Sequence, residues 1–189
     1  NGPFGGNERE INRTGFFVRK YLDKTPLAGT QGTKSAMWNV YFRISEAYLI
    51  AAEASWELSR NNSDVEALKY INAVRERAGI PNITVTYPQD LGDKDKMREW
   101  ILRERQIELA FEGDRFWTLA RRLLYEKEEN RKIYRMNVLA DDQGQGFAFE
   151  GFYERKLLQT RYWDNKMYLY PIAQTEIDRG RGLVQNPGW

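Results

Sequence analysis

The chain has 189 residues, of which 41% are hydrophobic and 30% are charged, a composition typical of a globular protein. Its formal net charge is +2 and the two signs are interleaved, so there is no basic stripe on which nucleic-acid binding could depend. The absence of cysteine and histidine excludes disulfides, thiol nucleophiles, serine–histidine–aspartate triads and nearly every zinc or iron site. Only carboxylate chemistry remains for catalysis, and we expect neither a cofactor nor a bound metal.

The first 40 residues predict an extended and loop-rich opening. Thr14–Leu22 alternates enough to be a short strand or an extended surface segment, whereas Asp23–Ser35 holds a proline and two glycines and is typical of a loop. No apolar run is long enough to span a bilayer, and the chain starts without a methionine or a signal sequence. This start favours a missing upstream part.

A helix is predicted from Arg43 to Arg60. A narrow stripe of small residues on one of its faces would let a partner helix approach closely. The stripe consists of Ala47, Ala51, Ala54 and Leu58.

The next helix is predicted between Ser63 and Gly79. Ser63 and Glu66 form a capping box, Gly79 takes the position of a glycine that follows a helix, and Pro81 prevents continuation. One face of this helix is apolar and holds Ala67, Leu68, Tyr70, Ile71, Val74 and Ala78. The two helices together predict an antiparallel hairpin of tetratricopeptide length, roughly 34 residues.

A third helix is predicted from Lys94 to Glu112, and it places Glu104 and Glu108 within an apolar stripe. The stripe consists of Met97, Trp100, Ile101, Ile107 and Phe111. Carboxylates in such a setting need partners. The arginines available for pairing are Arg75, Arg103, Arg105, Arg115, Arg121 and Arg122.

Two interpretations of Glu104 and Glu108 follow. One is a buried ion-pair lattice; the other is the general acid and base of a glycosidase, since residues one turn apart have Cβ atoms about 5–6 Å from each other. The flanking apolar residues indicate packing rather than a cleft, so we favour the ion-pair lattice.

Beyond this helix, Gly113 is expected to end it and Asp114 to cap another. The new helix would carry the apolar residues Phe116, Trp117, Leu119, Leu123 and Leu124. The charged run Glu126–Arg131 is interpreted as a solvated helix end.

Ala140–Gly151 is a glycine-rich loop whose Asp141 resembles the start of a calcium loop. No glutamate occupies the twelfth position, so the EF-hand pattern fails.

The C-terminal region predicts three short features. Lys166–Pro171 is expected to be extended, and Thr175–Asp178 is a capping-box variant that begins one helical turn. The tail Asn186–Trp189 is expected to dock through its aromatic residue.

With these elements in place, the chain resembles the C-terminal part of the SusD/RagB family, from about Trp38 to Trp189. Four stretches in the right order carry the resemblance: Arg43–Ala54 (RISEAYLIAAEA), Ile71–Gly79 (INAVRERAG), Glu104–Trp117 (ERQIELAFEGDRFW), and Tyr168–Ile177 (YLYPIAQTEI) running into Asn186-Pro-Gly. Two positions depart from the family pattern: Ala173 replaces a second proline, and Thr118 replaces an acidic residue.

The resemblance implies a mainly α fold, with tetratricopeptide-like helix pairs, long loops and short strands. Residues 1–189 would form the C-terminal part of a single SusD-like domain. Within it, 1–40 would be the extended and loop opening, 41–125 the helical core and 126–189 a loop-rich C-terminal segment.

The function implied by the resemblance is capture of a glycan or oligosaccharide without catalysis, on the extracellular face of the bacterial outer membrane. A lipid anchor on the missing N-terminal part would hold the protein there, beside a SusC-like TonB-dependent transporter. A tetratricopeptide-like scaffold that binds a protein or peptide is the main alternative, and a glycosidase using Glu104 and Glu108 is a third.

The motifs of the family are scaffold residues, so they identify no ligand contacts. Sequence context alone suggests Trp38, just before a helix, and Trp163, between a polar loop and the final extended piece, as exposed aromatics for ligand binding. For both, a docked loop anchor is the alternative, because tryptophan is highly buried on average.

Overall fold

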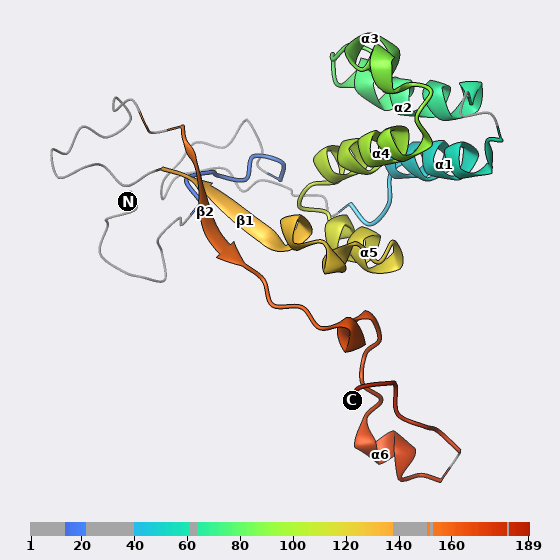
Figure 1. Cartoon of the computed structure of the whole chain (residues 1–189), viewed down its shortest axis with the longest axis vertical. Coiled ribbons are helices and arrows are strands. Elements are labelled where there is room, and N and C mark those ends of the chain that lie inside the picture. The colour runs from blue at the N-terminus through green and yellow to red at the C-terminus, as the bar shows by residue number, and fades with distance from the viewer. Residues whose placement is uncertain (1–13, 22–39, 61–63, 138–150, 152, 181) are drawn as a thin grey trace, which may run out of the picture. The chain divides into compact units, whose positions relative to one another are not determined.

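The computed structural model describes residues 14–21, 40–60, 64–137, 151, 153–180 and 182–189. The chain divides into two compact units, which we call the helical unit (residues 23–118) and the ribbon unit (residues 1–22 and 119–189). Helices dominate the described residues, and two short strands form the ribbon labelled β1 and β2 in Figure 1. The expected mainly α fold with short strands is therefore confirmed.

The predicted helix pair is present as α1 (Ile44–Leu58) and α2 (Val65–Arg77), which pack against each other. The face of α1 that packs is different from the predicted one. Leu49, Ala52 and Trp56 are buried, whereas Ala54 and Leu58 of the small-residue stripe are exposed. Burying the larger apolar side chains removes more surface from water than burying alanines would, so the face with Leu49 and Trp56 turns inward.

Helix α2 ends as predicted but begins one residue later. Asp64, not Ser63, is the N-cap, and its carboxylate accepts a hydrogen bond from the Ala67 amide at 2.8 Å; Ser63 lies outside the described residues. At the other end, Gly79 has a φ of +73°, and its amide donates to Glu76 O at 3.0 Å. This closing turn needs the left-handed conformation that glycine adopts without strain.

The third predicted helix is present as α4 (Lys94–Glu108), after the short helices α3 (Ile83–Thr86) and η2 (Pro88–Asp90). It ends four residues before Glu112, in a turn that includes Phe111 with a φ of +65°. The predicted apolar stripe is correct over Met97 and Ile101, which are buried. It is wrong at its end: Ile107, still within α4, is 61% exposed, and Phe111, in the turn after α4, is 67% exposed.

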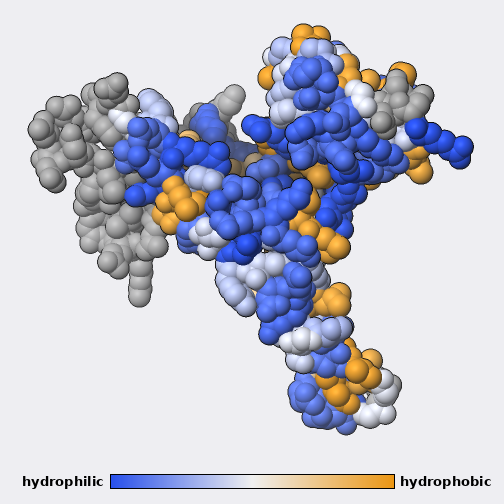
Figure 2. Space-filling view, viewed as in Figure 1, coloured by the Kyte–Doolittle hydropathy of each residue, from blue (hydrophilic) through white to orange (hydrophobic). Residues whose placement is uncertain are grey.

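The core of the helical unit joins α1, α2, α3 and α4. Its buried residues are Ala52, Trp56, Ala67, Ile71, Ile83, Met97 and Ile101. A second cluster joins Leu49, Val74 and Leu109. Over α4 the visible surface of this unit is mainly hydrophilic (Figure 2), as expected for a helix with one buried face.

Helix α5 (Asp114–Arg121) follows the turn at Gly113, as the sequence predicts. Of its apolar residues Leu119 is buried, whereas Phe116 and Trp117 are 38% and 60% exposed. The charged run does not continue as an α-helix. It forms part of the 3-10 helices η3 (Leu124–Glu126) and η4 (Glu128–Arg131), and its side chains are mostly exposed.

The ribbon consists of β1 (Lys132–Met136) and β2 (Arg155–Thr160), paired antiparallel with an irregularity between Ile133 and Tyr134. Residues 14–21 form no strand, so the strand interpretation of that stretch is wrong. They run beside the ribbon, where Thr14 O accepts from the Met136 amide at 3.0 Å. Most of the predicted loops at Asp23–Ser35 and Ala140–Gly151, with Asp141, lie outside the described residues.

The C-terminal segment differs in detail from its prediction. Residues 165–168 form the 3-10 helix η6 (Asn165–Tyr168) instead of an extended piece, because the Asp164 side chain caps this turn through the Lys166 amide. The helical turn α6 (Gln174–Ile177) starts before Thr175, which is therefore not its N-cap. Hydrophobic residues gather on one side of the part that holds α6 (Figure 2).

The tail docks as predicted. The indole Nε1 of Trp189 donates to the carbonyl oxygens of Lys166, at 3.0 Å, and Leu169, at 2.8 Å. The Lys166 ammonium lies 4.6 Å from the centre of the same ring.

Candidate functional site

Glu104 lies in the interior of the helical unit and is paired with one arginine. Arg75 Nη1 donates to Glu104 Oε2 at 2.6 Å, and the two residues are only 7% and 5% exposed. The same guanidinium donates from Nε to Pro81 O at 2.8 Å and from Nη2 to Thr86 Oγ1 at 3.0 Å. Arg75 thus ties α2 to α4 and to the turn that contains α3, and its donors are directed at protein acceptors.

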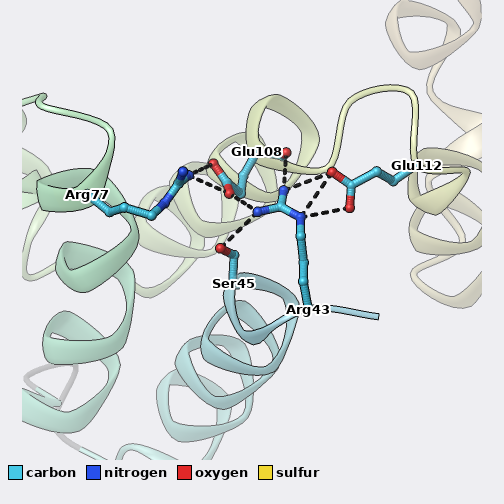
Figure 3. Close-up of polar contacts among 5 residues, drawn as sticks. All are labelled: Arg43, Ser45, Arg77, Glu108 and Glu112. Atoms are coloured by element: carbon cyan, nitrogen blue, oxygen red, sulfur yellow. Dashed lines mark hydrogen bonds and ion pairs between the residues drawn. The ribbon is translucent and has the colours of Figure 1, made fainter. Parts of the chain in front are cut away.

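Glu108 is shared by two arginines (Figure 3). Arg77 Nη2 lies 2.6 and 2.7 Å from its two carboxylate oxygens, and Arg43 donates to Oε1 from the other side. Arg43 also donates to Glu112 Oε2 at 2.9 Å, to the backbone oxygen of Glu108 at 2.6 Å and to Ser45 Oγ at 2.9 Å. The hydrogen bond to Glu112 is the main reason that the pKa of Arg43 is raised above its usual value, against the opposing effect of burial.

This geometry confirms the ion-pair interpretation of Glu104 and Glu108. A general acid or base must reach a substrate with a free carboxyl oxygen. Both oxygens of Glu108 and Oε2 of Glu104 accept from guanidinium groups, and Glu104 is buried among packed helices. Arg75 was among the predicted partners; Arg43 and Arg77 were missed. Arg77 could have been found, because it is a second basic residue in the last turn of α2, beside Arg75.

Two further arginines in the helical unit bind carboxylates. Arg105 Nε donates to Asp114 Oδ1 at 2.9 Å and to Thr118 Oγ1 at 3.1 Å, so the threonine at the departure from the family pattern takes part in a buried network. Arg98 Nη2 donates to Glu57 at 2.8 Å, and this bond is the largest cause of the raised pKa of Arg98. These contacts join helices to one another.

Of the two aromatic candidates, Trp163 is among the described residues and lies in the ribbon unit. Trp163 stacks on Tyr125 with ring centres 4.0 Å apart and planes at 16°, and it meets Tyr168 edge-on at 4.8 Å. Tyr125 is buried and Trp163 is half-buried. One face of the indole is therefore already covered by protein. Trp38 lies outside the described residues.

Exposed rings flank this aromatic stack. Tyr162 and Tyr170 are 74% and 64% exposed, on either side of Trp163 and Tyr168 in the chain. Neither tyrosine is predictable as an exposed ring from the sequence, since nothing in the local pattern separates an exposed tyrosine from a buried one.

Within the described part of the chain, no group of three or more carboxylates is arranged to hold a metal ion. None of the helices described by the structure is long and apolar enough to cross a membrane.

The helical unit is mainly α, is built on a tetratricopeptide-like helix pair and has its conspicuous carboxylates bound by arginines. These features define the fold class, and the comparisons with known proteins identify the family. Residues 3–189 match the SusD family, and the chain belongs to that family.

Relatives and solved structures agree with this assignment. The chain is 31% identical over 176 residues to SusD-like protein P2 of Formosa agariphila, covering 91% of this chain and 30% of P2. A SusD-like protein of Bacteroides fragilis matches with a TM-score of 0.61 and 31% identity, over 80% of this chain and 26% of that one. A SusD-like carbohydrate-binding protein of the same organism matches with a TM-score of 0.61 and 29% identity, over 89% and 33%.

The chain therefore spans about a third or less of the length of these proteins. The resemblance to the SusD/RagB family that the four sequence stretches indicate is confirmed.

Proposed function

We propose that the protein to which this chain belongs binds a glycan or oligosaccharide without cleaving it, and passes it to a SusC-like TonB-dependent transporter. It would act on the extracellular face of the bacterial outer membrane, held by a lipid anchor outside residues 1–189. These residues would be the C-terminal part of a single SusD-like domain. The observation that carries the proposal is the structural match to a SusD-like carbohydrate-binding protein over 89% of this chain.

The arrangement of the carboxylates supports binding rather than hydrolysis. A retaining glycosidase needs two carboxyl groups that face the scissile bond from about 5–5.5 Å apart. Glu104 and Glu108 have the sequence spacing for this, but each is directed at arginines of the helical unit. Their energetic role is to join helices, which leaves them unsuited to proton transfer at a sugar.

The test is a screen of the intact protein against a panel of glycans by titration calorimetry, with reducing ends assayed in the same samples. We expect at least one glycan to bind with modest affinity, because few polar groups and flat rings fix such ligands. No reducing ends should accumulate. Heat-denatured protein is the control for both measurements.

Two outcomes would contradict the proposal. Reducing ends that increase with protein concentration would establish a hydrolase. Failure to bind any glycan, together with binding of a protein or peptide from the same operon, would favour the tetratricopeptide-like scaffold.

Trp38 and Trp163 are the aromatic residues that we propose as ligand contacts. For Trp163, we expect Trp163→Ala to weaken glycan binding about tenfold, a typical loss when a stacking ring is removed from a desolvated contact. The thermal midpoint of the same variant must be measured, since the ring also packs on Tyr125. A lower midpoint with unchanged affinity of the folded protein would mean that Trp163 only anchors its loop.

A further inference from the structure

The ribbon places cations directly opposite one another. In the register of β1 and β2, Arg135 faces Lys156. At the start of the ribbon, the Arg161 amide donates to Arg131 O at 2.9 Å, so these two arginines also meet across the strands. Like charges in facing positions destabilise a strand pair. Two such pairs on one short ribbon therefore need a compensating interaction.

Some cations of the ribbon have a partner within the chain. Lys132 pairs with Glu129 at 2.7 Å and with Glu128, contacts that raise its pKa. Lys156 pairs with Glu154. The guanidinium of Arg155 lies 3.6 Å from the centre of a tyrosine ring.

Three arginines of the ribbon have no such partner. The side chains of Arg131, Arg135 and Arg161 form no ion pair or hydrogen bond with any residue that the structure describes. Arg131 and Arg135 are half-buried, and the Nε atom of each is buried without an acceptor. Arg161 is exposed.

In the helical unit, five arginines with withdrawn side chains or close carboxylates are paired: Arg43, Arg75, Arg77, Arg98 and Arg105 each bind a carboxylate. The exposed Arg60 and Arg103 bind none among the described residues, so the contrast with the ribbon lies in Arg131 and Arg135, whose Nε atoms are buried. Withdrawing a guanidinium from water is costly unless an anion accepts hydrogen bonds from its N–H groups. The buried Nε atoms of Arg131 and Arg135, beside the exposed Arg161, thus favour an anion that none of the described residues supplies.

We infer that the ribbon binds an anionic glycan, whose carboxylate or sulfate groups accept hydrogen bonds from Arg131, Arg135 and Arg161. The inference rests on the proposed function and names the class of glycan. A guanidinium presents its donors as a planar fork that matches these groups in a bidentate manner. Arg131 and Arg135 are four residues apart, roughly 13 Å along an extended strand, which suits anions repeated along a polymer better than one compact anion.

The experiment measures binding of the intact protein to two matched pairs of polysaccharides. These are polygalacturonate against its methyl ester, and κ-carrageenan against agarose. We expect an acidic member to bind at least about tenfold more tightly than its uncharged counterpart, with an affinity that falls as salt is added.

The variant that tests the ribbon is Arg135→Gln, and Arg179→Gln is its control. Both remove one positive charge from the ribbon unit, but Arg179 is an exposed residue of the C-terminal segment that pairs with Glu176. We expect Arg135→Gln to weaken binding of the acidic glycan about tenfold and to flatten its salt dependence. Arg179→Gln should leave both unchanged. Arg161→Gln, at an exposed position, repeats the test where a substitution disturbs little packing.

The outcomes separate this inference from the proposed function. Equal affinity for the acidic and uncharged members would overturn the anionic class and leave glycan binding intact. Unchanged affinity in both ribbon variants would overturn the site. Binding to phosphatidylserine vesicles and to no polysaccharide would assign the ribbon to a lipid surface, and would remove the inference together with the proposed function.

Discussion

Replacing Glu104 with glutamine is expected to lower the free energy of unfolding by about 3–5 kcal/mol, the cost of leaving a buried charge without its partner. Glu104→Gln would leave the Arg75 guanidinium charged in the interior, where its exposed fraction is 7%. The shape of the side chain is nearly unchanged, so little of the loss would come from packing. Denaturant unfolding of the intact protein, followed by circular dichroism, measures the change.

Two matched substitutions make this result specific. Glu66→Gln removes a carboxylate that is 56% exposed and paired with Lys69 at 3.5 Å, and it should cost less than about 1 kcal/mol. Glu108→Gln should lie between the two, because Arg77 is 58% exposed and can be solvated. Full stability of Glu104→Gln, together with loss of a measurable hydrolytic activity, would show that the structural interpretation is wrong.

Replacing Trp56 with alanine is expected to cost about 3–5 kcal/mol, the usual range for truncating a large buried aromatic residue. Trp56 is 1% exposed, lies in the core formed by α1, α2, α3 and α4, and donates from Nε1 to Lys94 O at 3.0 Å. Trp56→Phe separates the two contributions. It keeps much of the apolar contact and loses the hydrogen bond, so it should cost less than the alanine variant.

The control for this substitution is Trp117→Ala. Trp117 is 60% exposed and meets Phe116 edge-on at 5.1 Å, so its truncation should cost less than about 1.5 kcal/mol. Denaturant midpoints and slopes of all three variants provide the comparison. A Trp56→Ala protein as stable as the Trp117→Ala protein would contradict the assignment of Trp56 to the centre of the core.

The arginine–carboxylate contacts explain why the family could be identified from short motifs while its ligand could not. Arg43, Arg75 and Arg77 come from two of the matching stretches, and Glu104 and Glu108 come from a third. In the folded chain these residues bind one another across α1, α2 and α4. In this chain the motifs therefore describe how the helices are joined and not what the protein binds.

Local chemistry was enough to predict much of the fold. The helix pair, the closing turn at Gly79 and the docking of Trp189 follow from apolar spacing, from the conformational freedom of glycine and from the tendency of an indole to pack its ring while its N–H finds acceptors. The presence of arginine partners for Glu104 and Glu108 was also predictable, since a charge on an apolar helix face must be paired.

Only the tertiary structure decided which face of α1 turns inward, where α4 ends and which arginines reach Glu108. Each depends on residues far apart in the chain: Arg43 meets Glu108 across 65 positions, and Trp56 meets Lys94 across 38. The same is true of the unpaired arginines of the ribbon. A local pattern records the type of each side chain, but the partner that satisfies its charge, or the lack of one, depends on which distant segments the folded chain brings together.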